Sequence, residues 1–289
     1  MTVVDDWPLL PYEEWRETRD TLHMFMQIVG KVRLVLEPME PQWAQVPLYL
    51  TARGLNTSPI PHPTGPFDID VDFIDHGVTV RTTRGRLERV ALRPQPVAEF
   101  YAALMAALAA AGVPTEITEL PSEVPDPIPF PADTEHKSYD PEAVNRFWRA
   151  LSSVDVVLKA HRARFRGKVS PVQFFWGSFD LAYTRYSGRL LEPPADADVI
   201  TRYSQDAEQI CAGFWPGNAT VPEAAFFAYT FPSPAGIEST AGWRADLGEF
   251  LLPYDSVRTA DDPRAALLDF LETTYRAGVE LAHWDPALS

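Results

Sequence analysis

The sequence predicts an α+β fold made of two similar halves in a pseudo-twofold arrangement, each a helix, an antiparallel sheet and a second helix. The tripeptide Gly-Lys-Val follows a predicted helix at 30–32 and again at 167–169. Later in each half, an arginine opens a segment that ends in Gly-Val, at 93–113 and at 258–279. In both halves, helices bracket blocks of strands joined by short turns. That order favours antiparallel sheets over a doubly wound fold.

The first half, residues 1–120, begins with a helix from about residue 12 to residue 28. Pro11 suits its first turn, and Gly30 suits the position just after its end. An apolar stripe at helical spacing supports this helix: Trp15, Thr18, Leu22, Phe25, Met26 and Val29. Strands are expected at 32–37, 46–51, 67–74, 78–82 and 87–92, with a hairpin turn at 75–77. A second helix is expected at 96–111.

Residues 121–139 form a proline-rich linker with acidic residues between the prolines. Such sequences are extended and semi-rigid. Two interpretations remain open, a strap packed on the surface of the protein and a docking motif for a partner.

The second half, residues 140–289, opens with Asp140-Pro141, an acidic N-cap followed by proline at the first helical position. Strands are expected at 172–187, 208–214, 224–231 and 249–254. Asp262-Pro263 repeats the capping pattern and predicts a last helix to about residue 278.

Composition excludes several functional classes. The chain has 289 residues and a net charge of −15, so it should repel nucleic acid unless it carries a local basic patch. The densest basic run, 161–168, is more typical of a helix C-terminus, where cations meet the helix dipole, than of a polyanion site. Cys211 is the only cysteine, which rules out an intrachain disulfide. Residues 1–6 lack the apolar core of a signal peptide, and the longest apolar run is too short to cross a membrane. We therefore expect a cytoplasmic protein; its oligomeric state is not indicated.

No nucleotide, metalloprotease, kinase or hydrolase motif is present, so no cofactor is indicated. Attention therefore falls on polar residues in apolar surroundings. In an expected strand at 172–185, alternation places Ser178 and Asp180 on a face shared with Trp176. Aromatic residues line both faces of this strand, so the Asp180 carboxylate should be buried and paired with a cationic side chain.

The candidate charge partners of Asp180 are Arg185, Arg189 and Lys168, and Trp176 and Trp215 are candidate walls of an aromatic site. Asp180 and Ser178 are the candidate catalytic residues. Asp180 could be a general base or ligand anchor, or half of a structural ion pair.

The first helix carries a polar column of Arg16, Asp20, His23 and Gln27 beside its apolar stripe. His23 and Gln27 lie four residues apart and share a face, so they could contact a ligand or form a solvated edge. His76 is expected in a turn. No spacing of histidines and acids requires a metal.

Several stretches together resemble a bacterial, largely actinobacterial family, domain-of-unknown-function family 5996. They include residues 22–24, 27–32, 46–49, 57–61, 72–76, 139–148, 174–182, 213–217 and 250–255. The resemblance covers nearly the whole chain. It implies one full-length module of two coupled halves, and it carries over no reaction, substrate or catalytic residue.

The leading functional hypothesis is a small-molecule binding protein or cofactor-independent enzyme, with its site in the second half near the junction with the first. The alternative is a non-catalytic interaction or structural protein whose aromatic strands are a filled core. A concave pocket with Asp180 exposed inside it would favour the first, and a filled core would favour the second.

Overall fold

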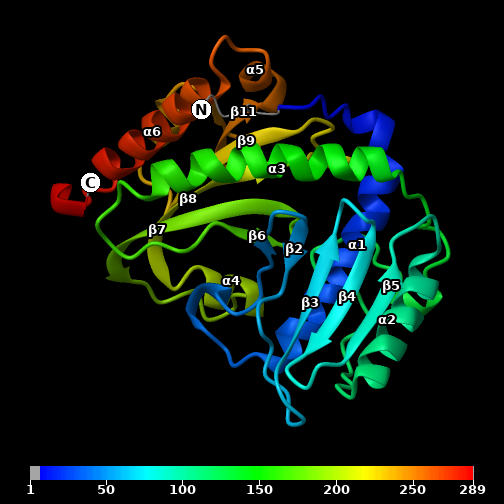
Figure 1. Ribbon diagram of the computed structural model, residues 1–289. Helices are drawn as coiled ribbons and strands as arrows, with labels where there is room; N and C mark the ends of the chain where they lie inside the picture. Colours follow the sequence, from blue (N-terminus) through cyan, green and yellow to red (C-terminus); the bar gives the residue numbers. More distant parts are fainter. Residues whose placement is uncertain (1–6, 289) are drawn as a thin grey trace.

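The computed structural model describes residues 7–288, and it confirms the α+β class (Figure 1). Residues 1–6, on which the expectation of no signal peptide rests, lie outside the described part. The first sheet has the strand order β1-β2-β3-β4-β5, and the second has the order β10-β11-β9-β8-β7-β6, with antiparallel neighbours throughout.

The first half consists of α1 Tyr12–Leu36, β1 Tyr49–Leu50, β2 Gly54–Asn56, β3 Phe67–Asp72, β4 Gly77–Thr82, β5 Leu87–Ala91 and α2 Val97–Ala111. The second consists of α3 Pro141–Arg162, β6 Gln173–Phe175, β7 Asp180–Leu190, α4 Val199–Ser204, β8 Ala207–Trp215, β9 Ala225–Phe231, β10 Trp243–Arg244, β11 Glu249–Pro253, α5 Tyr254–Arg258 and α6 Pro263–Leu281. Short 3-10 turns lie at Pro41–Trp43, Phe130–Ala132, Ile237–Ser239 and Pro286–Leu288.

The predicted caps of the second-half helices are present. The Asp140 carboxylate accepts from the Glu142 N–H at 2.9 Å at the start of α3. Asp262 accepts from the Ala265 N–H at 3.0 Å at the start of α6. Each satisfies a backbone donor that the first helical turn cannot.

The expected end of α1 was wrong. The helix continues through Gly30 to Leu36, so the strand expected at 32–37 is helical. Gly30 does not end the helix; its missing side chain leaves space for a residue of the second half. A Cβ on Gly30 would lie 2.2 Å from Cδ1 of Trp176, a side chain of the second half. Gly167 likewise is not a left-handed helix end, because it does not have a positive φ. The repeated Gly-Lys-Val therefore does not mark matching positions.

The two halves share the order helix, antiparallel sheet, helix, but they have five and six strands, and β10 lies outside β11 in the second sheet. The pseudo-twofold arrangement stays a prediction. One hydrophobic core nevertheless spans both halves, with Phe25 stacked on Phe100 and Phe147 on Phe179 in the same buried cluster.

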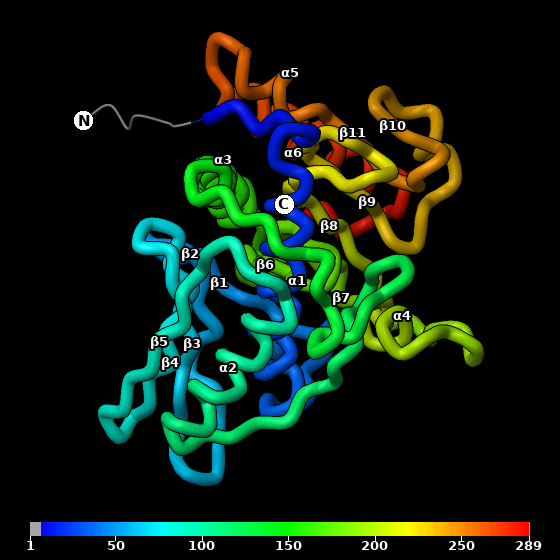
Figure 2. The backbone as a smooth tube through the Cα atoms, turned by 90° about the vertical axis from the view of Figure 1, so that its right-hand side faces the viewer, coloured from blue at the N-terminus to red at the C-terminus, as the bar shows by residue number. Residues whose placement is uncertain are grey.

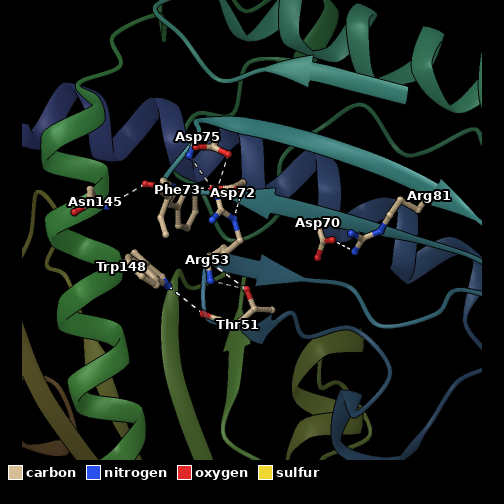
Figure 3. A network of polar contacts seen from close by, with 11 residues as sticks. Thr51, Arg53, Asp70, Asp72, Phe73, Asp75, Arg81, Asn145 and Trp148 are labelled. Carbon is tan, nitrogen blue, oxygen red and sulfur yellow. Dashed lines mark hydrogen bonds and ion pairs between the residues drawn. The ribbon is translucent and has the colours of Figure 1, made fainter. Parts of the chain in front are cut away.

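The halves are joined directly by backbone and side-chain contacts. Leu48 exchanges two 2.8 Å hydrogen bonds with Phe174, linking the first half to β6. Figure 3 shows a second junction, where α3 meets the first sheet. Trp148 Nε1 donates to the Thr51 carbonyl at 3.2 Å, and Asn145 Nδ2 donates to the Phe73 carbonyl at 3.2 Å.

Ion pairs hold the loop beside this junction (Figure 3). Arg53 donates to Asp72 at 2.5 Å and to Asp75 at 2.7 Å. Asp72 also accepts the backbone N–H groups of Ile74 and Asp75, each at 2.8 Å. These bonds close the β3–β4 turn that the sequence predicted at 75–77.

Residues 121–139, called the strap from here on, pack against the protein, as the first of the two interpretations of the linker expected. Figure 2 shows this segment returning alongside α1 toward the second sheet. Phe130 and Asp133 are fully buried. The Asp133 carboxylate accepts the N–H groups of Glu135 and His136, each at 3.1 Å. No helix in the described part is long and apolar enough to cross a membrane.

Candidate functional site

The segment carrying Ser178 and Asp180 is a tight hairpin and not the single strand that was expected. β6 ends at Phe175, and β7 begins at Asp180, which is paired with Phe175. Phe179 has a left-handed φ of 63°, and its N–H bonds to the Phe175 carbonyl at 2.8 Å. The turn reverses the chain, so strict alternation cannot run through residues 176–179.

One face of the second sheet packs on α3 and α6, and the other, called the outer face from here on, points away from both helices. Tyr183 and Arg185 lie on the helix side, where Tyr183 contacts His161 of α3 and Arg185 contacts Tyr275 of α6. Asp180, Thr184, Cys211, Trp215, Tyr229 and Glu249 alternate with those residues along paired strands, which places them on the outer face.

A histidine of α1 hydrogen-bonds to the backbone of the hairpin turn at residues 176–179. His23 Nε2 lies 3.0 Å from the Trp176 carbonyl and 2.9 Å from the Gly177 carbonyl, so this nitrogen carries the proton and donates. Burial lowers the pKa of His23 to about 3, so the ring is neutral. Its ring lies 4.8 Å from that of Phe179. His23 is therefore a buried anchor of the turn and not part of a solvated edge.

The same column of α1 fixes the strap. Gln27, fully buried, accepts from the Ser122 N–H at 3.1 Å and donates to its carbonyl at 2.7 Å. Lys31 Nζ donates to Ser122 Oγ at 2.9 Å. The column is thus Arg19, His23, Gln27 and Lys31, four residues apart, in place of the expected one through Arg16 and Asp20. It joins the turn at 176–179 to the strap.

Asp180 is 8% exposed, and Ser178 Oγ donates to its Oδ1. Burial, together with the charges of Glu123 and Glu249, raises the pKa of Asp180 to about 7. Burial also raises the pKa of Glu249, on β11, to about 7. Burial and then the charge of Asp198 raise the pKa of Glu123, in the strap. Three carboxyls from separate parts of the chain therefore lie in one region, and the pKa of each is raised.

The expected charge partners of Asp180 are elsewhere, which corrects the prediction. Arg185 is buried on the opposite face, where it donates to the His161 carbonyl and stacks 4.1 Å from the Tyr275 ring centre. Lys168 donates to Gln42 Oε1 at 2.8 Å. Arg189 pairs with Glu208. Arg185 is an odd number of residues from Asp180 on one strand, so the pleat separates the two side chains. Within the described residues, no ion pair involves Asp180, Glu123 or Glu249.

The outer face is partly apolar. Trp215, Phe175, Tyr229 and Leu247 border a small buried cluster made of Ala182, Cys211, Val221, Ala225, Phe227 and Leu251. Of the two predicted walls, Trp215 therefore lies on this face. Trp176 does not, because it is buried against α1 and donates to the Val46 carbonyl at 2.9 Å. Burial raises the pKa of the Cys211 thiol to about 12, so it stays protonated and is no nucleophile.

Two surface hollows, of about 390 Å³ beside Arg276 on α6 and about 560 Å³ beside Glu13 and Lys137, are both away from Asp180. The part of the chain that is described holds no cluster of His, Cys, Asp or Glu suited to a metal ion. His76 instead bonds to the Tyr139 hydroxyl at 2.9 Å.

Sequence reasoning missed Glu123, Glu249 and Lys31. Glu249 begins an expected strand and could have been placed by its alternation with Leu251. No local signal distinguished Glu123 from the other acids of the linker, because only the path of the strap brings it to the turn.

The chain belongs to a family of unknown function, DUF5996, whose model matches residues 7–289. No curated protein matches the chain, and no solved structure does.

Proposed function

We propose that the protein is a small-molecule binding protein or a cofactor-independent enzyme whose site is the outer face around Asp180. The observation that carries this proposal is a buried carboxyl group near two further carboxyls, with no cationic side chain among residues 7–288 paired to any of them. Such an arrangement is costly for a purely structural role, because it weakens the native state whenever the acids ionise.

The chemistry that this arrangement supports is proton transfer. A general acid or base works best with a pKa close to the working pH, and burial brings the pKa of Asp180 to about 7. Ser178 orients one carboxyl oxygen, and His23 holds the turn from which both residues project. Trp215 and Tyr229 supply aromatic surface for an apolar part of a ligand. The same proposal places the protein in the cytoplasm, in keeping with its one buried cysteine.

One observation favours the alternative, a non-catalytic interaction or structural protein. The outer face holds a buried apolar cluster, and the two hollows lie elsewhere. In that case Asp180 belongs to a filled layer between the sheet and the loops that cover it.

Native mass spectrometry of the freshly purified full-length chain separates the two functions, followed by a thermal-shift screen of small molecules at pH 7. The proposal expects a ligand whose binding falls at least tenfold in Asp180→Asn. Asp155→Asn is the matched control, because Asp155 is a buried carboxyl on α3 that pairs with Lys159 at 2.6 Å. Equal binding by Asp180→Asn and wild type would refute Asp180 as the centre of the site.

A further inference from the structure

Lys31 of α1 is the buried lysine of this chain. It is 3% exposed, whereas the other lysines, at 137, 159 and 168, lie on the surface. Its Nζ lies 2.9 Å from Ser122 Oγ on the strap and 5.7 Å from the centre of the Trp176 ring. No carboxylate within residues 7–288 pairs with this amine. A buried ammonium group without an anion is costly, so burial lowers the pKa of Lys31.

The charge state of Lys31 decides which way its bond to Ser122 runs. As an ammonium group it donates to Ser122 Oγ, and as a neutral amine it accepts the bond from the Ser122 hydroxyl. A serine hydroxyl is a weak nucleophile until a base within hydrogen-bond reach takes its proton, and the separation of 2.9 Å lies within that reach. The Trp176 ring would then stabilise the ammonium group that forms.

Ser122 is fixed at its backbone and half-buried, so that its position is set while one side stays open to solvent. Gln27 accepts from its N–H at 3.1 Å and donates to its carbonyl at 2.7 Å. The next two backbone N–H groups, those of Glu123 and Val124, donate no hydrogen bond within the described residues. Free backbone donors next to a nucleophile are the groups that stabilise the oxygen anion formed in acyl transfer.

We propose that Ser122 and Lys31 form a nucleophile–base pair that hydrolyses small carboxylic esters through an acyl-serine intermediate. Serine–lysine pairs are a known variant of the serine–histidine arrangement, with the lysine as the base. The pair goes beyond the proposed function of the outer face, because in the described chain neither residue bonds to Asp180.

The reaction runs in two steps that need no reactant besides the ester and water. Ser122 Oγ bonds to the ester carbonyl carbon, and its proton passes to Lys31 Nζ as the carbonyl oxygen becomes an anion. The bond from that carbon to the alcohol oxygen then breaks, and Lys31 gives the proton to the departing alcohol. In the second step, water bonds to the acyl carbon and passes a proton to Lys31, which returns it to Ser122 Oγ as the acid leaves. Both residues end in their starting forms.

Covalent labelling of the full chain at pH 8 with a fluorophosphonate tests the pair, because a nucleophilic serine displaces the fluoride from phosphorus whatever acyl group it normally takes. Peptide mapping by mass spectrometry locates the label. We expect it on Ser122, and we expect hydrolysis of para-nitrophenyl acetate with an acetyl group on the same residue. Wild-type chain without a label on Ser122 would overturn the proposal. A label on Ser178 in its place would also overturn it, in favour of a nucleophile beside Asp180.

Variants separate a Lys31 that acts as a base from one that only fastens the strap. Lys31→Arg keeps a donor for Ser122 Oγ but cannot lose its proton, and Lys31→Met keeps the apolar stem without the amine. The labelling rate should fall by roughly a hundredfold in each, the usual contribution of a positioned base, and Ser122→Ala should take no label at that position. Propylamine added to Lys31→Ala should restore part of the rate, which a purely structural role does not predict.

Two control variants show that the effect belongs to this pair. Ser138 lies on the same strap and donates to Glu17 at 2.9 Å, and Lys159 pairs with Asp155 at 2.6 Å. Ser138→Ala and Lys159→Met should label at the wild-type rate, and thermal melts confirm that each variant is folded. An unchanged labelling rate in Lys31→Arg and Lys31→Met would refute Lys31 as the base. The labelling needs no contribution from Asp180, so its outcome is independent of the proposed function.

Discussion

Replacing Asp180 by Asn should stabilise the protein, and only at neutral and basic pH. Burial raises the pKa of Asp180 from 3.8 to about 7, so the folded protein retains a proton that the unfolded chain has released. A group with a raised carboxyl pKa contributes stability that is lost as pH rises from about 4 through about 7. Three pKa units at 1.36 kcal/mol each give a penalty of about 4 kcal/mol on the ionised native state.

Asn is neutral at every pH and nearly the same shape, so it avoids this penalty. We expect the free energy of unfolding of Asp180→Asn to exceed that of wild type by up to about 4 kcal/mol at pH 8, and to differ by less than about 1 kcal/mol at pH 4. Urea unfolding at both pH values, with m-values checked for equality, measures the difference.

Asp72→Asn is the matched control. Hydrogen bonds from backbone N–H groups and from Arg53 lower the pKa of Asp72, although burial opposes them, so this substitution should destabilise the protein at pH 8. A loss of about 3–5 kcal/mol at pH 8 in Asp180→Asn would refute the reasoning, because that is the cost of stranding a buried cationic partner.

Three further predictions concern packing, the strap and charge. Gly30→Ala should lower the free energy of unfolding by about 1–3 kcal/mol in denaturant unfolding, because its Cβ would overlap Trp176. Alanine usually stabilises a helix relative to glycine, so the sign is opposite to the ordinary one. The loss should shrink in a Trp176→Ala background. Gln27→Leu should cost about 1–3 kcal/mol in the same unfolding measurement, since it removes both bonds to the Ser122 backbone, and an unchanged stability would contradict this role. With its charge of −15, the protein should show no micromolar complex with random duplex or single strand in a mobility-shift assay at physiological salt, and such a complex would contradict the charge argument.

Local signals predicted much of the fold. Asp140 and Asp262 cap their helices because a carboxylate next to a free N–H needs only its neighbours in sequence. Apolar periodicity placed most helices and the long antiparallel strands, and the turn at 75–77 was found from its residues alone. The burial of Asp180 also followed from its aromatic neighbours along the chain.

The partners of these residues depended on tertiary structure. Gly30 looks like a helix end in sequence, and only the approach of Trp176 from the other half explains why it is glycine inside a helix. Arg185 is five residues from Asp180 along one strand, yet the pleat turns it toward α6. His23 and Gln27 are buried because the 176–179 turn and the strap fold over them.

The sequence by itself determined the class of fold, the acidic surface and a buried carboxyl in an aromatic segment, because each depends on composition or on neighbours within a few residues. Only the tertiary structure decided that this carboxyl pairs with no cation of the described chain and lies near Glu123 and Glu249. Those three residues are far apart in the chain, and contacts between distant segments arise from the packing of the whole core, which no local pattern encodes.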